Sequence, residues 1–325
     1  MMHPVPAHHL PEDNLPATRR ARRVIRAPGS RIWAWLLFVI AMAAGIWATH
    51  RFFVLASRGQ VLDQAGLDSA TVRLETLHEA SVSLLADLPI VVASIAAVGF
   101  LVLTLWRRRW AASLIVALTF AAANFTTQVL KVILERPELA NGVPYYTGNS
   151  LPSGHATFAT AAFAAVFLLV APRWRSSVAL IGVIFSATVG VATFLDGWHR
   201  PSDIVAAYLV VAMWTLIGGF IIYRLSSDWN VVSPHSRAQH AGMAEITLWL
   251  LGIVALGGAI AVFILSGGFD GLPTTLEGFG PSPRWFIFGA LLIAGSASLI
   301  FALLASFFRW EAGREALDPE PVGLR

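Results

Sequence analysis

The sequence predicts an all-α polytopic membrane helix bundle of about eight spans. The first observation is composition: 56% of the 325 residues are hydrophobic and 13% are charged, whereas a soluble domain has about 25% charged residues. The second is that the apolar residues gather in eight runs, most of them about 18 residues or longer. The third is the uneven placement of basic residues between these runs.

The runs begin at residue 32 and continue almost to the C-terminus. The first is longer than the roughly 7–15 apolar residues of a signal peptide, so we expect it to remain as a membrane helix. The fourth run is short, and we expect Ser153 to Thr157 to supply its first turn. The predicted spans are 32–48, 88–106, 110–130, 157–171, 177–195, 204–223, 246–265 and 285–308.

Tryptophans lie near the predicted ends of several spans, where an aromatic belt would place them at the membrane–water interfaces. They are Trp33, Trp35, Trp106, Trp110, Trp198, Trp285 and Trp310.

The chain divides into four parts. Residues 1–31 are polar and rich in arginine, and we expect a disordered, basic cytoplasmic tail that orients the first span. Residues 32–225 form the membrane core, residues 226–308 hold the two additional transmembrane helices, and residues 309–325 form a second cytoplasmic tail.

Two predicted outer loops are long. Residues 57–87 mix apolar and acidic side chains, which fits amphipathic helices on the membrane surface as well as it fits a plain surface loop. Residues 266–284 are rich in glycine and proline and are expected to form an irregular loop.

The basic residues predict the orientation. With the N-terminus in the cytoplasm, 16 of the 23 basic residues fall in cytoplasmic segments. Both termini are then cytoplasmic. The seven outer basic residues are Arg51, Arg58, Arg73, Lys131, Arg136, Arg200 and Arg284.

Composition also excludes several kinds of chemistry. The chain has no cysteine, which rules out disulfides, thiolate catalysis and thiolate metal sites. No set of carboxylates or histidines has metal-ligand spacing on one face, so we expect neither metal nor cofactor. The net charge of +4 comes from arginines around the spans and indicates no nucleic-acid partner. The oligomeric state stays open.

Three polar segments interrupt the apolar pattern, and all three fall on the predicted outer face. The central one is Leu-Pro-Ser-Gly-His at 151–155. Ser153 is a good N-cap, so a helix should start there and point its free N–H groups outward, where an anion can bind. Gly154 allows close approach of a ligand to the backbone, and His155 can exchange a proton. An ordinary capped helix would give the same pattern.

The third segment contains His199 and Asp203, four residues apart. If a helix starts near Pro201, the carboxylate can reach the imidazole, fix its tautomer and leave the other ring nitrogen free to react. A simple hydrogen-bonded helix cap is the alternative.

The first segment carries Lys131 and Arg136, with Pro137 ending the helix. Two cations at the outer mouth of the bundle suit a phosphate group. Snorkelling of long basic side chains to the interface is the alternative, although Lys131 is the only lysine in the chain.

Together, the three segments resemble the type 2 phosphatidic acid phosphatase family, the membrane lipid-phosphate phosphatases related to bacterial acid phosphatases and vanadium haloperoxidases. The resemblance covers roughly residues 50–225 and implies a six-helix phosphatase core and a metal-free, two-step hydrolysis through a phosphohistidine. It implies that His199 is the nucleophile, oriented by Asp203, and that His155 protonates the leaving oxygen. It also implies phosphate binding by Lys131, Arg136, Ser153 and Gly154.

The sequence departs from the family pattern twice. Lys131 and Arg136 are five residues apart, whereas the family spaces this pair by seven. Ala192 and Thr193 stand where the family's third motif has Ser-Arg, so one phosphate-binding arginine is missing. Our hypothesis is that Arg200 substitutes for it.

The resemblance implies a membrane phosphatase that hydrolyses a lipid phosphate or diphosphate. The predicted orientation places its site on the outer face, which favours polyprenyl diphosphate, and the composition, rich in alanine and arginine and poor in lysine, suggests a bacterial plasma membrane. Phosphatidic acid and phosphatidylglycerol phosphate are the alternative substrates. A lipid phosphotransferase and a non-catalytic lipid-phosphate binder or transporter are the alternative functions; the missing arginine and the two extra spans motivate the binder.

Overall fold

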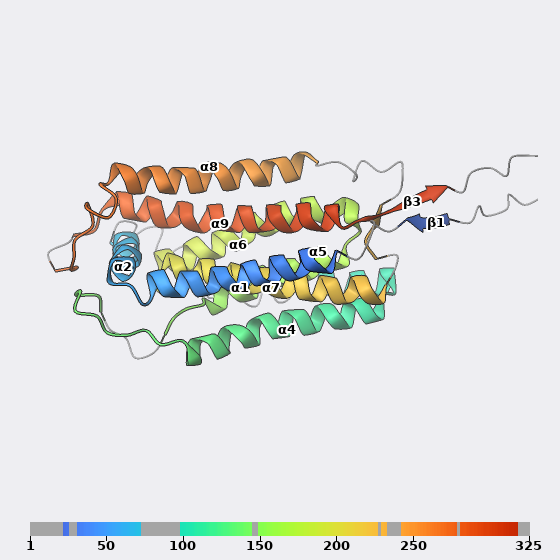
Figure 1. The fold of residues 1–325 in the computed structure, drawn as a ribbon, viewed down its shortest axis with the longest axis horizontal. Coiled ribbons are helices and arrows are strands. Elements are labelled where there is room, and N and C mark those ends of the chain that lie inside the picture. The colour runs from blue at the N-terminus through green and yellow to red at the C-terminus, as the bar shows by residue number, and fades with distance from the viewer. Residues whose placement is uncertain are drawn as a thin grey trace, which may run out of the picture.

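The computed structural model describes residues 22–25, 31–72, 98–144, 149–226, 229–232, 242–277 and 280–317. Long helices run side by side along one axis, and most connections lie at the two ends (Figure 1). The helices are α1 Ile32–Phe53, α2 Ser57–Thr71, α4 Trp110–Ile133, α5 Gly154–Leu169, α6 Arg175–Leu195, α7 Pro201–Leu225, α8 Met243–Leu265 and α9 Pro283–Trp310. An unlabelled helix covers Val98–Arg107, and a 3-10 turn covers Pro172–Trp174.

The predicted all-α membrane bundle is confirmed. Within the described residues, six helices are long and apolar enough to cross a membrane, and Val98–Arg107 and α5 are shorter apolar helices. Each predicted span coincides with a helix, except that residues 88–97 of the second span lie outside the described residues. Helix α5 begins at Gly154 because Ser153 caps it, as the sequence predicted.

Helix α7 is the central helix of the bundle. It packs against α1, α4, α5 and α9, and most of its residues are buried. Gly190 of α6 permits a close approach to α7, because a Cβ at this position would lie 2.5 Å from the hydroxyl oxygen of Tyr208. The site described below therefore rests on a rigid core helix.

Helix α2 lies across the end of the bundle and is seen nearly end-on in Figure 1. The sequence left a surface helix and a plain loop open for residues 57–71. These residues form a helix, which packs against α1, α6, α7 and α9 with most of its residues buried. Its polar residues make contacts inside the protein. In a helix on the membrane surface, the same residues would contact water and lipid headgroups. Residues 73–87 of that predicted loop lie outside the described residues.

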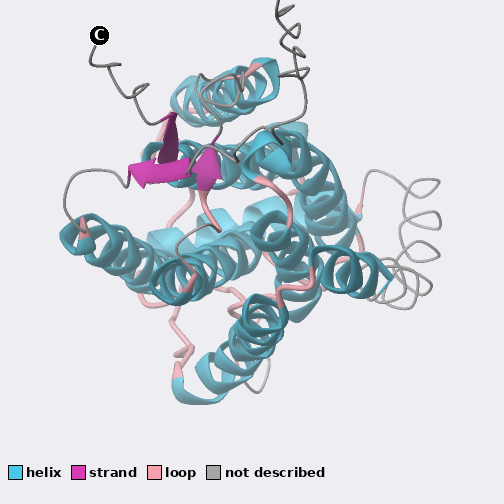
Figure 2. Cartoon of the chain, turned by 90° about the vertical axis from the view of Figure 1, so that its right-hand side faces the viewer, coloured by secondary structure: helices cyan, strands magenta, loops and turns pink. Residues whose placement is uncertain are grey.

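The two additional helices form a hairpin attached through α9. Helix α9 packs on α2, α6 and α7, whereas α8 packs mainly on α9 and stands at the periphery of the bundle (Figure 2). The described part of the predicted 266–284 loop consists of turns and bends, and its Leu276 N–H donates to the Asn141 carbonyl at 2.8 Å. The hairpin thus reaches the end of the bundle that holds α2.

The opposite end carries a small sheet of strand order β1-β3-β2, formed by β1 Arg22–Ile25, β2 Val231–Val232 and β3 Gly313–Leu317. Strand β3 pairs antiparallel with β1 and parallel with β2. The sequence predicted disorder in both tails. Instead, residues of the two tails form paired strands, because each strand supplies hydrogen-bond partners for the backbone N–H and C=O groups of the other. The other residues of the predicted tails, apart from those at the helix ends, lie outside the described residues.

Two tryptophans assigned to the aromatic belt were misplaced. Trp35 and Trp285 are each 3% exposed. The indole N–H of Trp35 donates to the Glu311 carboxylate at 3.1 Å, and Trp285 packs near Phe288 of α9. A position near a helix end does not determine whether the side chain faces lipid or protein. In α1 and α9, the faces that carry these two tryptophans are covered by protein.

Candidate active site

The starts of α5 and α7 meet at the end of the bundle covered by α2. The backbone N–H of Ser153, the N-cap of α5, donates to the backbone carbonyl of Asp203 in the first turn of α7 at 2.8 Å. This bond joins the second and third polar segments directly. The two helix starts therefore lie side by side, and the first turn of α5 presents its free N–H groups to this region.

The start of α5 has the geometry of an anion-binding helix N-terminus. The Ser153 hydroxyl accepts from the Ala156 N–H at 3.3 Å, and the Thr157 hydroxyl donates to the Ser153 carbonyl at 2.8 Å. A Cβ placed on Gly154 would lie 3.7 Å from both Lys131 Nζ and Gln128 Nε2. The lysine of the first segment therefore reaches the glycine of the second.

Asp203 is the buried centre of the third segment. Its Oδ2 accepts from the Arg200 backbone N–H at 3.1 Å and lies 3.5 Å from Nδ1 of His199. Its Oδ1 lies 3.6 Å from Nη2 of Arg136. One carboxylate thus links the first and third segments, and it orients the imidazole so that Nε2 is the ring nitrogen turned away from the carboxylate.

His155 faces His199 across the site. The centroids of the two imidazole rings are 6.3 Å apart, and the ring of Trp198 lies 5.3 Å from that of His155. The partly exposed Trp198 forms one wall beside His155. Two imidazoles this close together can act on one substrate, one as the nucleophile and the other as the proton donor.

Arg136 and Arg200 bring unsatisfied donors into this buried region. Both residues are less than 10% exposed. None of the three guanidinium nitrogens of Arg136 has a hydrogen-bond partner, and Nη2 of Arg200 also lacks one. Buried donors normally have partners. Nη2 of Arg136 has the Asp203 carboxylate at 3.6 Å, and the other N–H groups are suited to bind an anion such as a phosphate.

The charges around Arg136 fit this interpretation. Burial is the main cause that lowers the pKa of the Arg136 guanidinium; the charge of Asp203 opposes this shift, and the charge of Arg200 adds to it. The two guanidinium groups are therefore close enough to repel each other. An anion between them would relieve the repulsion and satisfy their N–H groups.

Thr193 does not replace the arginine of the family pattern. Its hydroxyl donates to the Gly190 carbonyl at 2.9 Å within α6, and the residue is fully buried. Its carbonyl accepts from the N–H groups of Trp198 and His199 at 3.1 and 3.2 Å. Thr193 shapes the turn before His199, and Arg200 is the guanidinium that reaches the region.

Helix α2 contributes two residues that sequence reasoning missed. Asp63 accepts from the Ser202 N–H at 3.1 Å and from its hydroxyl at 2.5 Å, and Gln64 accepts from Nε of Arg200 at 2.8 Å. Burial, followed by the charge of Asp203, raises the pKa of Asp63 to about 6. The only sequence signal was the polar Asp-Gln pair within a segment of uncertain structure.

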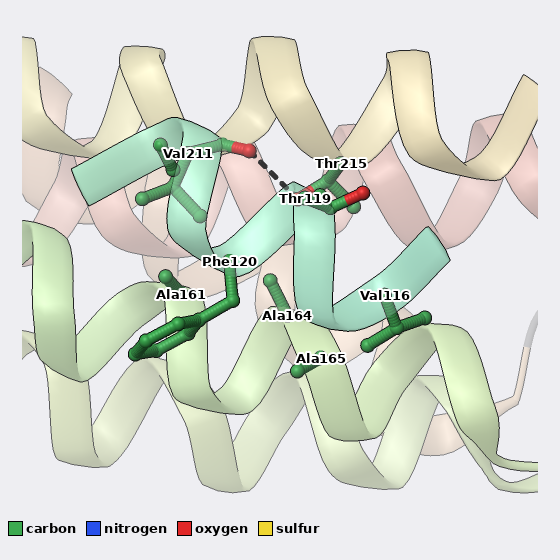
Figure 3. Close-up of a pocket in the computed structure, with 9 residues that line it drawn as sticks. Val116, Thr119, Phe120, Ala161, Ala164, Ala165, Val211 and Thr215 are labelled. Carbon is green, nitrogen blue, oxygen red and sulfur yellow. Dashed lines mark hydrogen bonds between the residues drawn. The ribbon is translucent and has the colours of Figure 1, made fainter. Parts of the chain in front are cut away.

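A small pocket elsewhere in the bundle has a different character. It lies between α4, α5 and α7, and its lining is mostly apolar (Figure 3). Its polar residues are Thr119 and Thr215, and the Thr215 hydroxyl donates to the Val211 carbonyl at 2.7 Å. None of the predicted site residues lines this pocket, so it is separate from the candidate active site.

Comparison with protein families identifies the fold. The PAP2 superfamily matches residues 112–230, a range that includes α4 from its third residue, all of α5, α6 and α7, and every predicted site residue. The chain carries a PAP2 superfamily domain. The resemblance to type 2 phosphatidic acid phosphatases, stated from the three polar segments, is thereby confirmed.

The PAP2 domain does not include α1, α2, α8 or α9. Comparison with curated proteins and with solved structures gave no match. A PAP2 domain within a bundle of long apolar helices supports a multi-pass membrane lipid phosphatase, a phosphoester hydrolase, as the general class of this protein.

Proposed function

We propose that this PAP2 protein hydrolyses a lipid phosphate or diphosphate through a phosphohistidine on His199. The observation that carries the proposal is the Asp203 carboxylate, which lies 3.5 Å from Nδ1 of His199 and 3.6 Å from Nη2 of Arg136. It couples a candidate nucleophile to a candidate phosphate ligand. Phosphoryl transfer needs mainly placement of the reacting groups and stabilisation of charge, which this arrangement supplies.

In the first step, Nε2 of His199 attacks phosphorus, and the bond from phosphorus to the leaving oxygen breaks. His155 donates a proton to that oxygen, so the alcohol or the shorter phosphate leaves. Asp203 stabilises the positive charge that forms on the His199 ring. In the second step, water attacks phosphorus and gives a proton to His155, and the phosphorus–nitrogen bond breaks to release inorganic phosphate.

The phosphoryl oxygens would be held by cations of the first and third segments and by the backbone at the start of α5. Lys131, Arg136 and Arg200 supply the positive charge, and Ser153 and Gly154 supply the capped start of α5. The buried and unsatisfied nitrogens of Arg136 and Arg200 support this assignment. No metal or cofactor takes part in the proposed reaction.

The favoured substrate is a polyprenyl diphosphate, at the outer face of a bacterial plasma membrane with both termini in the cytoplasm. The distribution of basic residues supports this orientation, since 16 of 23 lie on the predicted cytoplasmic side. A site on the outer face suits the recycling of a polyprenyl diphosphate carrier. Phosphatidic acid and phosphatidylglycerol phosphate remain the alternative substrates.

The test is phosphate release by the purified protein in detergent from a panel of polyprenyl diphosphate, phosphatidic acid and phosphatidylglycerol phosphate. The proposal predicts inorganic phosphate, most rapidly from the diphosphate. A phosphorylated acceptor in place of free phosphate would establish the phosphotransferase alternative. Unchanged lipid that nevertheless binds the protein would establish the binder alternative.

A further inference from the structure

Arg200 is held by residues outside its own helix. Its Nε donates to Oε1 of Gln64 at 2.8 Å, and its Nη1 donates to the Ser150 hydroxyl at 3.4 Å. Its Nη2 is buried without a hydrogen-bond partner. Two nitrogens of the guanidinium are thus fixed by protein, and the third is left for another acceptor.

Gln64 is itself fixed in one orientation. Its Nε2 donates to Oδ1 of Asp68 at 2.7 Å on the next turn of α2, which leaves Oε1 for the arginine. An amide is suited to this position, because it accepts on one side and donates on the other. Asp68, Gln64 and Arg200 therefore form a chain of hydrogen bonds that starts on α2 and ends in the site.

Helix α2 is a rigid support for this chain. The neighbouring residue, Asp63, bonds both the N–H and the hydroxyl of Ser202 at the start of α7. The Ser69 hydroxyl accepts from the Ser282 N–H, immediately before α9, at 3.0 Å. The additional hairpin thus holds α2, and α2 holds the residues around Arg200.

Arg200 needs such support. It is the N-cap of α7, and its long side chain has many rotamers to lose. The nearby charge of Arg136 repels it. Without a fixed partner for Nε, repulsion from Arg136 would favour rotamers that move the guanidinium away from the phosphate.

We propose that Gln64 is a positioning residue that directs the Arg200 guanidinium at the substrate phosphate, in place of the arginine missing at Thr193. The proposal rests on the proposed function, because it takes the same site as the place where phosphate binds. It gives α2 and, through it, the α8–α9 hairpin a role in substrate binding.

A double-mutant cycle on the full-length protein tests the proposal, with binding of orthovanadate as the readout. Orthovanadate is a phosphate mimic, and its binding needs no turnover. Gln64→Met keeps the length of the side chain and removes the acceptor. Loss of a hydrogen bond to a charged group predicts about tenfold to hundredfold weaker binding. Arg200→Gln should weaken binding at least as much.

The decisive result is non-additivity. If Gln64 acts through Arg200, Gln64→Met has no further effect in the Arg200→Gln background. Arg58→Gln is the matched control on α2, since Arg58 is exposed and donates to the Phe269 carbonyl at 3.4 Å, away from Arg200. This control should bind orthovanadate like the wild type.

A second variant keeps the test decisive if Gln64→Met does not fold. Gln64→Asn keeps a polar amide but withdraws its oxygen from Nε of Arg200, and it should weaken binding only while Arg200 is present. Additive losses, or unchanged binding in folded Gln64→Met, would overturn the positioning role alone. Wild-type protein that binds orthovanadate but releases no phosphate from any lipid would overturn hydrolysis and leave the positioning role supported. Absence of orthovanadate binding by the wild type would overturn both.

Discussion

The Oδ2 atom of Asp203 lies 3.5 Å from Nδ1 of His199, without a hydrogen bond between the two side chains. This separation is longer than a normal hydrogen bond, and such contacts often tighten only when substrate is bound. The carboxylate is fully buried and also contacts Arg136 at 3.6 Å. Orientation of His199 and binding of phosphate by Arg136 should therefore be lost together when this carboxylate is changed.

Asp203→Asn tests that coupling. The amide keeps an acceptor for the Arg200 N–H but removes the negative charge that stabilises the imidazolium and Arg136. We expect phosphate release to fall by about 10²–10⁴-fold, measured as kcat and kcat/KM with the favoured lipid. Asp63→Asn is the matched control, because it removes a buried carboxylate that contacts Ser202 and leaves His199 untouched. Equal losses in the two variants would contradict a special role for Asp203.

His155→Ala separates acid catalysis from nucleophilic attack. A phosphate leaves more easily than an alkoxide, so the variant should lose much more activity on lipid monophosphates than on lipid diphosphates. The measurement is the ratio of phosphate-release rates for the two substrate classes, compared with the wild type. A uniform loss on both classes would show that His155 does not protonate the leaving oxygen.

Gly154→Ala tests close approach at the start of α5. The new methyl group would lie 3.7 Å from Lys131 Nζ, an ordinary van der Waals contact, so the unliganded protein should fold normally. It would occupy space that the proposal assigns to the phosphoryl group. We expect weaker orthovanadate inhibition with little change in thermal stability. Unchanged inhibition would place the phosphate away from this helix start.

The pKa of Asp63, which burial raises to about 6, predicts a pH dependence of stability. Between its ordinary value of 3.8 and about 6, the folded protein binds more protons at this group than the unfolded chain does. The contribution of Asp63 to the free energy of unfolding should therefore decrease as pH rises through this window. Thermal unfolding in detergent from pH 4 to 7 should show this step in the wild type and lose it in Asp63→Asn. The same profile in both proteins would contradict the assignment.

The donor set predicts that hydrolysis needs no metal ion. In the part of the chain that the structure describes, no group of three or more histidine or acidic side chains is placed to hold a metal ion. We expect hydrolysis to continue in excess EDTA and to be inhibited by orthovanadate. Activity that disappears with EDTA and returns with magnesium would contradict the mechanism.

The predictions from sequence succeeded where the contacts are local. The Ser153 hydroxyl caps α5 by accepting from the Ala156 N–H three residues later, and Asp203 reaches back four residues to His199. Such contacts follow from helix geometry, so spacing alone predicts them. Hydrophobic runs likewise predicted the long helices because burial in lipid depends on composition more than on exact partners.

The predictions failed or stopped where the contacts are distant in sequence. Asp63 and Ser202 are separated by 139 residues, and Gln64 and Arg200 by 136. No local pattern indicates that α2 turns its polar residues toward α7, so residues 57–71 fitted a helix and a loop equally well. The buried face of Trp35 is likewise set by α7 and α9, which contribute Phe220 and Phe307.

Covalent labelling tests the assignment of His199 as the nucleophile. Wild-type protein and His199→Ala would be incubated with lipid substrate carrying a radioactive terminal phosphate, quenched within one turnover, and analysed for labelled peptides by mass spectrometry. We predict an acid-labile, alkali-stable phosphate on residue 199 in the wild type, and neither label nor phosphate release in folded His199→Ala. Phosphate release by His199→Ala at a rate near that of the wild type, or a label on another residue, would contradict the account.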